Sequence, residues 1–180
     1  MSRSGVAAAA CLACLLGIST ASAAWAPPLL PTIARRAGEA TTSVRCLTPG
    51  EWSARRLTRG AVAVRRGGRL FVTDHACSVI VGYATAFPHV PRAGSTAELD
   101  VTGSLYRFLV ASVSRLGLGR GRADCRVLVS FLPALVTLGA PSNGYAANVR
   151  KRLLVARKRL HIDVRPWTGC PVKLPRAAPA

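Results

Sequence analysis

A chain of 180 residues that carries 25 lysines and arginines against seven acidic residues has a formal net charge of +18, and it will be attracted to polyanions. Arginine outnumbers lysine 22 to 3, a bias that a GC-rich genome also produces, and only 6% of the residues are aromatic. Because single-strand nucleic-acid platforms depend on aromatic stacking, the composition argues against specific recognition, and we expect no nucleic-acid partner.

The first 23 residues have the pattern of a secretory signal peptide. Arg3 supplies the positive start, residues 5–18 are apolar, and residues 21–23 (ASA) form a small-x-small cleavage motif. The apolar run is shorter than the roughly 20 residues that span a bilayer, and no later segment is long enough. We therefore expect cleavage after residue 23 or 26 and an exported mature chain without an anchor of its own.

The rest of the chain is expected to form one domain. Residues 24–44 are rich in Pro, Ala, Thr and Arg without apolar periodicity, which predicts a flexible leader. Residues 45–173 are predicted to form a single domain, and residues 174–180 a disordered tail. The roughly 155 residues after the signal are enough for a modest hydrophobic core.

Four cysteines follow the signal peptide, namely Cys46, Cys77, Cys125 and Cys170. An even number of cysteines in an exported chain favours disulfides, and three pairings of four cysteines are possible. The chain has no C-x-x-C pair after the signal that would indicate zinc.

The first half of the domain has the pattern of a short helix and a β-hairpin. The TPGE sequence at 48–51 predicts a helix start with a capping box, and the helix should end at Gly60. Two β-like runs at 61–64 and 70–73 flank a Gly-Gly pair at 67–68, which tolerates the positive φ of a tight turn.

The second half is predicted to be mainly helical. Residues 77–87 fit a strand or a short helix, and their β-branched residues favour the strand. A capping-box sequence at 95–98 starts a helix that ends near Gly117, and further helices are expected over 123–138 and 145–160. The predicted fold is a disulfide-linked α+β domain, in which short N-terminal strands or a hairpin precede about three helices.

Two of the predicted helices carry apolar side chains well beyond one face, over residues 105–116 and 127–138. Such helices are either central core helices or are covered by another protein. Two of them in so small a domain are hard to bury fully, so we predict an exposed apolar patch that binds a partner. The predicted partner-binding residues are Phe108, Val110, Val113, Val129, Leu132 and Val136.

The sequence has no recognisable catalytic or metal-binding constellation. None of the three histidines has a second ligand one helical turn away. Only Asp74, Asp100 and Asp124 remain for acid–base chemistry. We therefore expect neither enzymatic activity nor a metal or other cofactor.

The last predicted helix is strongly basic, because the RKR sequence at 150–152 recurs at 157–159 beside apolar positions. This pattern fits a helix that binds anionic surfaces, and it also fits a packed helix whose long charged side chains stay in solvent. We favour the packed helix. The rival function is a secreted basic protein that adheres to anionic surfaces through this helix.

The chain resembles glycoprotein L of the gammaherpesviruses. The resemblance is strongest over residues 105–117, above all the sequence RFLVASVSRLG at 107–117. In that family a similar apolar helix follows a strand-rich, cysteine-bearing first half and precedes a second apolar helix, here 125–138. The similarity extends from Cys46 to Asn148, which leaves the basic segment outside it.

The chain also departs from the family pattern. The family has two adjacent cysteines where this chain has Cys46 and Leu47, and a cysteine where it has Leu99-Asp100. Both departures are explained by one missing bridge, so the resemblance implies a Cys46–Cys77 disulfide. We predict this bridge together with Cys125–Cys170, as one of the three pairings.

The resemblance implies a non-enzymatic viral envelope subunit. Members of the family lack an anchor, bind glycoprotein H, and help it to fold and to leave the endoplasmic reticulum. The pair assists glycoprotein B in membrane fusion during infection and can bind host receptors. The expected location is the virion envelope and the host secretory pathway and cell membrane, where the partner holds the subunit.

Overall fold

A computed structural model describes residues 29–38, 43–85, 92, 95–141, 144–166 and 168–172. The predicted signal peptide and C-terminal tail lie outside these residues. The elements in chain order are α1 (Leu29–Gly38), β1 (Ser43–Leu47), α2 (Pro49–Ala54), β2 (Ala63–Arg66), β3 (Arg69–Thr73), α3 (Asp74–Thr85), α4 (Thr96–Val113), the short 3-10 helix η1 (Ser114–Leu116), α5 (Arg120–Thr137) and α6 (Tyr145–Ala156).

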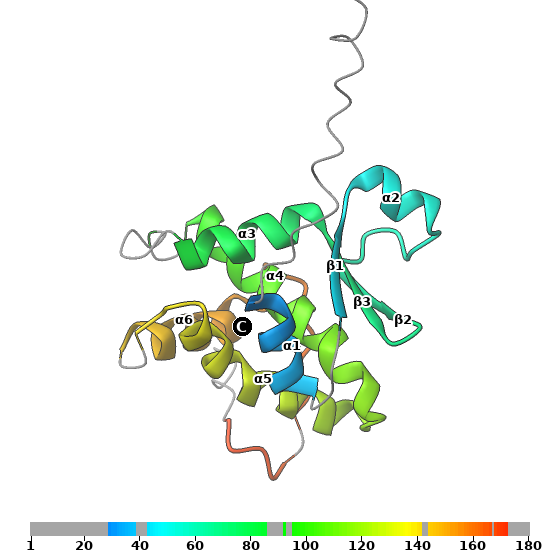
Figure 1. Ribbon diagram of the computed structural model, residues 1–180. Helices are drawn as coiled ribbons and strands as arrows, with labels where there is room; N and C mark the ends of the chain where they lie inside the picture. The colour runs from blue at the N-terminus through cyan, green and yellow to red at the C-terminus, as the bar shows by residue number, and fades with distance from the viewer. Residues whose placement is uncertain are drawn as a thin grey trace, which may run out of the picture.

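The predicted α+β class is confirmed. The three strands form a sheet in the order β1-β3-β2, with β1 parallel and β2 antiparallel to β3. The sheet and α2 lie on one side of the molecule, and the remaining helices gather on the other (Figure 1). After the strands come α3, α4, α5 and α6, one helix more than the three that we expected.

Helix α4 is the centre of the fold. It packs against α1, α3, α5 and α6, and also contacts β2 and β3. Its fully buried side chains include Leu105, Phe108 and Leu109, which join Leu128 and Phe131 of α5 in the main core. A smaller apolar cluster of Leu47, Trp52 and Phe71 lies between the sheet and α2.

The predicted flexible leader is wrong for residues 29–38, which form α1. Its apolar residues Leu30, Ile33, Ala34 and Ala37 recur at helical spacing and are buried against α4 and α5. The contact with α4 is close, because a Cβ at Gly38 would lie 2.7 Å from the carbonyl oxygen of Ser112. The domain core therefore begins upstream of residue 45.

The strand favoured for residues 77–87 is also wrong, because α3 covers this segment up to Thr85. Ala76, Cys77, Ile80 and Tyr83 are buried on one side of that helix, a spacing that only a helix can present to the core. The β-branched residues of the segment therefore lie in a helix and form no hydrogen bonds of a β-sheet. The remaining predicted residues, 86 and 87, lie outside the described residues.

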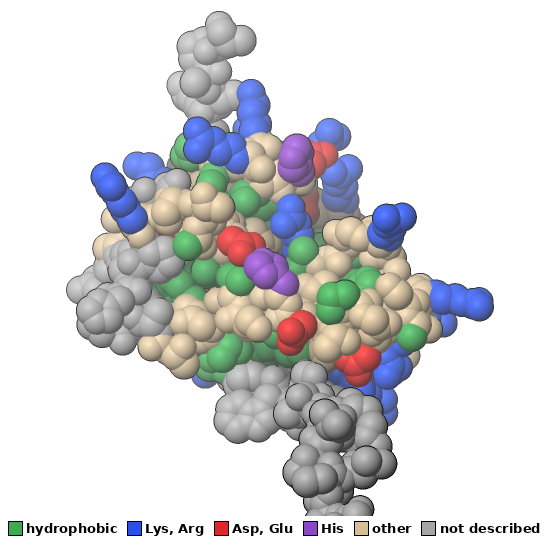
Figure 2. Space-filling model, turned by 90° about the horizontal axis from the view of Figure 1, so that it is seen from above, with side chains coloured by type: hydrophobic (Ala, Val, Ile, Leu, Met, Phe, Trp, Pro, Cys, Tyr) green, Lys and Arg blue, Asp and Glu red, His purple; other side chains and the backbone are tan. Residues whose placement is uncertain are grey.

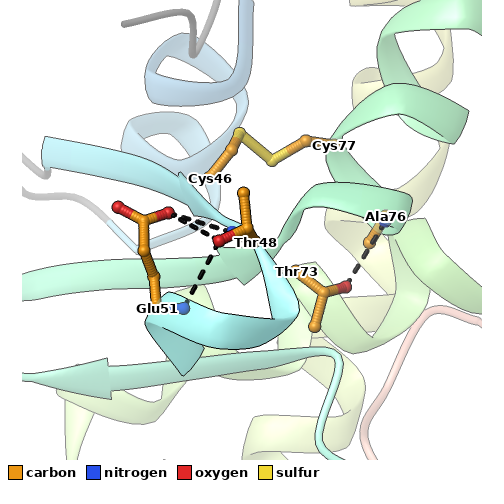
Figure 3. Close-up of a disulfide and its surroundings, with 6 residues drawn as sticks. All are labelled: Cys46, Thr48, Glu51, Thr73, Ala76 and Cys77. Carbon is orange, nitrogen blue, oxygen red and sulfur yellow. Dashed lines mark hydrogen bonds between the residues drawn. A yellow bond between two sulfur atoms is a disulfide. The ribbon is translucent and has the colours of Figure 1, made fainter. Parts of the chain in front are cut away.

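The hairpin and the first helix start are confirmed. Gly67 and Gly68 have φ of 55° and 75° at the turn between β2 and β3. The hydroxyl of Thr48 accepts from the Glu51 N–H at 3.3 Å, and the Glu51 carboxylate accepts from the Thr48 N–H at 3.0 Å (Figure 3). The helix ends at Ala54, earlier than the predicted Gly60.

Both predicted disulfides are confirmed. Cys46–Cys77 joins β1 to α3 across 31 residues, with 6.1 Å between the Cα atoms (Figure 3). Cys125–Cys170 joins α5 to the C-terminal segment across 45 residues, with 5.6 Å between the Cα atoms. The two bridges therefore connect β1 to α3 and the segment around Cys170 to α5.

Candidate partner-binding surface

The predicted partner-binding residues fall into a buried and an accessible group. Phe108 and Val113 of α4 are 0% and 1% exposed. Since α4 is surrounded by other elements of the domain, these two side chains have no surface left for a partner. Their predicted role as contacts is therefore corrected to a role in the core.

The accessible group lies mainly on α5. Val129 and Val136 are 36% and 41% exposed, and Leu132 between them is half-buried. These positions are three, four and seven residues apart, so they lie along one side of the helix. Val110 is 42% exposed but belongs to α4. The α5 residues thus form a continuous apolar strip, and Val110 is a separate exposed position.

A groove runs beside this strip, between α1 and α5. It has a volume of about 160 Å³, and its apolar lining comes from Ile33 and Ala37 of α1 and from Val129, Pro133 and Ala134 of α5. Pro133 has no N–H to donate to the carbonyl of Val129, so this carbonyl lacks its usual helix donor. The lining of the groove is therefore largely apolar, and it includes the proline that interrupts the hydrogen bonds of α5.

Two arginines flank the groove and connect its walls. Arg36 of α1 donates from Nη1 to Oγ1 of Thr137 at 2.8 Å, and Arg126 of α5 donates from Nε to the carbonyl of Ala37 at 3.0 Å. These bonds hold α1 against α5 and place two positive charges at the groove. We call the groove, Arg36, Arg126, Leu132 and Val136 together the α1–α5 face.

The α1 half of this face is not among the residues predicted from the sequence, because residues 24–44 are expected there to form a flexible leader. The signal that would have found it is the spacing of Leu30, Ile33 and Ala37, which follows helical periodicity. Arg36 was missed for the same reason. Its pairing with Thr137, 101 residues away, depends on tertiary packing that local patterns do not report.

The residues considered for acid–base chemistry are spread over the surface. Nε2 of His75 lies 2.9 Å from Oδ2 of Asp100, and both side chains are exposed. Asp124 accepts the backbone N–H of Arg165 at 2.8 Å. Among the described residues, no group of three or more His, Cys, Asp or Glu is placed to hold a metal ion. The expectation of a non-enzymatic protein stays a prediction.

The basic helix α6 is packed by its apolar side. Val149 and Leu153 are buried, whereas Lys151 is exposed to solvent. Arg152 turns inward and donates from Nη1 to Oε1 of Glu98 at 2.6 Å, and the Glu98 side chain is only 3% exposed. The helix thus has a structural role, while Lys151 on the helix and Lys158 and Arg159 just after it are exposed.

No known protein family, no curated protein sequence and no solved structure matches this chain. Within the described ranges, none of the helices combines the length and the apolar character needed to cross a membrane.

Proposed function

We propose that this protein is a glycoprotein L-like subunit that binds glycoprotein H and assists its folding and transport. Together with glycoprotein B, the pair would take part in the fusion of viral and host membranes. The observation that carries the proposal is the α1–α5 face, where exposed valines border an apolar groove between two arginines. The resemblance over residues 105–117 supplies the identity of the partner.

The size of the groove supports an anchor-type contact. Its volume of about 160 Å³ is close to the roughly 150 Å³ of an apolar cavity that binds benzene. One large apolar side chain of the partner would fill it, as anchors do at the centre of many interfaces. A carboxylate next to that anchor would meet Arg36 and Arg126, which lie at the groove.

The location of the protein follows from the same proposal. A subunit that binds glycoprotein H would reach the virion envelope, the secretory pathway and the cell membrane through this partner. The two disulfides support passage through an oxidising compartment. A host receptor would then bind the assembled pair.

Co-expression with the cognate glycoprotein H tests the proposal. Export of both chains should depend on their co-expression, and Val129→Asp or Val136→Asp should each reduce co-purification at least about tenfold, because a charge would be buried in the interface. Val155→Asp on α6 is the matched control, since Val155 is 66% exposed and lies outside the α1–α5 face.

Disulfide mapping and thermal unfolding of each variant report whether the domain still folds. The proposal is supported if the wild-type protein and the Val155→Asp control both co-purify with glycoprotein H, and both α5 variants lose this co-purification. If the wild-type chain is exported when expressed alone and does not co-purify with glycoprotein H, the proposal fails.

The alternative function is a secreted basic protein that adheres to anionic surfaces. Exposed Lys151, Val155 and Lys158 on or just after α6 favour it, because a membrane-surface helix combines basic and apolar side chains. Replacing Arg150, Lys151, Arg157 and Lys158 with glutamine should then weaken salt-sensitive retention on anionic vesicles without unfolding the domain. Equal retention of that variant would discard the alternative.

A further inference from the structure

A second surface, distinct from the α1–α5 face, is unusually rich in arginine. Residues 55–69 contain six arginines, and no Asp or Glu occurs between Glu51 and Asp74. Five of the six, Arg55, Arg56, Arg59, Arg66 and Arg69, are exposed. We call this segment the arginine hairpin. Figure 2 shows one face of the molecule, on which lysine and arginine side chains project mainly around the edge and several acidic side chains lie among them.

The fold brings these arginines together. The turn at Gly67 and Gly68 reverses the chain, so that Arg66 and Arg69 are partners in the β2–β3 ladder. Nη1 of Arg66 donates to the carbonyl of Arg55 at 3.0 Å, which ties the strand to the end of α2. The guanidinium of Arg55 lies 5.5 Å from the ring centroid of Phe71.

Two hollows adjoin on this surface. The first has a volume of about 480 Å³ and includes Arg55, Arg66 and Arg69 in its lining. The second has a volume of about 430 Å³ and is lined in part by Arg55, Arg56 and Arg66. Because Arg55, Leu57 and Arg66 belong to both, the hollows form one continuous cationic track.

We propose that the arginine hairpin binds a sulfated polysaccharide. Planar guanidinium groups donate paired hydrogen bonds to sulfate-type oxyanions, which favours arginine over lysine at such sites. Two adjoining hollows fit successive anionic groups of one polymer better than a single small ion. The site is independent of the proposed partner surface.

Three observations favour a polysaccharide over other polyanions. Phe71 is 7% exposed beneath Arg55, so the track offers no aromatic platform on which nucleic-acid bases would stack. The exposed residues of segment 55–69 are arginine, threonine and glycine, which offer no large apolar side chain for insertion into a bilayer. The disulfides also fit an extracellular setting, where sulfated polysaccharides occur.

The test compares two variants of equal charge. One replaces Arg55, Arg66 and Arg69 with glutamine, and the other replaces Arg150, Arg157 and Arg159 of the basic segment in the same way. Binding of the purified full-length mature protein to immobilised heparin is measured at about 0.15 M ionic strength, where exposed charges interact over roughly 8 Å. The first variant should bind about tenfold more weakly or worse, and the second should stay within about twofold of wild type.

Equal losses in both variants would show attraction by total charge and would overturn the proposal. A loss confined to the second variant would place the site on the basic helix and would overturn it as well. A DNA duplex and phosphatidylserine vesicles serve as competitors, and either one displacing heparin at equal charge concentration contradicts the choice of ligand. If the first variant does not fold by disulfide mapping, Arg69→Glu at the exposed strand end replaces it, with the same expected loss.

Discussion

At the scale of single residues, Glu98 joins α4 to α6. The hydroxyl of Ser95 accepts from the Glu98 N–H at 3.2 Å and caps α4 as the sequence predicts. The Glu98 carboxylate instead pairs with Arg152, 54 residues away. Local spacing therefore predicts the cap, whereas the ion pair depends on where α6 packs.

Replacement of Arg152 by alanine should lower the free energy of unfolding by about 1–3 kcal/mol, because the buried Glu98 carboxylate would lose its charged donor. Urea unfolding measures the difference. Arg150→Ala, a change at a neighbouring position on the same helix, should shift stability by no more than about 0.5 kcal/mol. Equal effects of the two changes would argue against the Glu98–Arg152 pair.

Glu51 makes stability depend on pH. The Thr48 backbone N–H lowers the pKa of this carboxyl, and Arg45 at 3.2 Å lowers it further. A carboxylate with a lowered pKa stabilises the fold above its unfolded pKa, about 4.3, and loses this contribution as the pH falls through the folded value. Glu51→Gln should therefore be less stable than wild type at pH 7, and the difference should vanish at strongly acidic pH. A difference that is unchanged from pH 7 to pH 2 would rule out this role.

At the scale of elements, α1 determines how much of α4 and α5 is covered. Ile33 is 2% exposed in its contact with these helices. Ile33→Ala should cost about 2–4 kcal/mol of unfolding free energy, as expected for a buried large-to-small change. Arg35→Ala on the exposed side of α1 is the control and should cost less than about 0.5 kcal/mol. If the Ile33→Ala variant is as stable as wild type, Ile33 does not contribute to the core, and the flexible leader predicted for this segment would be correct.

The elements that the sequence predicts well are those with local signals. The Gly67–Gly68 turn and the Thr48 cap depend on residues within a few positions of each other. Helix α3 is different, because its β-branched residues favour a strand in isolation, while burial of Ile80 and Tyr83 on one side selects the helix. Packing against distant elements overrides propensity there.

At the scale of the whole molecule, the two apolar helices are covered to different extents: α5 exposes Val129 and Val136, whereas on α4 the exposed large apolar side chain is Val110. Helix α4 is covered by α1, α3, α5 and α6, so Phe108 and Val113 belong to the core. A helix that is apolar on all sides exposes only the side chains that its neighbours leave uncovered. The sequence does not predict α1, which covers part of both α4 and α5. The sequence therefore predicts an apolar surface, and only the tertiary arrangement locates it at Val129 and Val136.

The most direct test of the proposed function is the mass of the species formed when the purified mature protein is mixed with the soluble ectodomain of its cognate glycoprotein H. Size-exclusion chromatography with light scattering should show one species with the summed mass of one copy of each chain. An obligate contact of this kind buries an interface of about 2,000 Å² or more and survives dilution. Two separately eluting monomers at micromolar concentration would contradict the proposal.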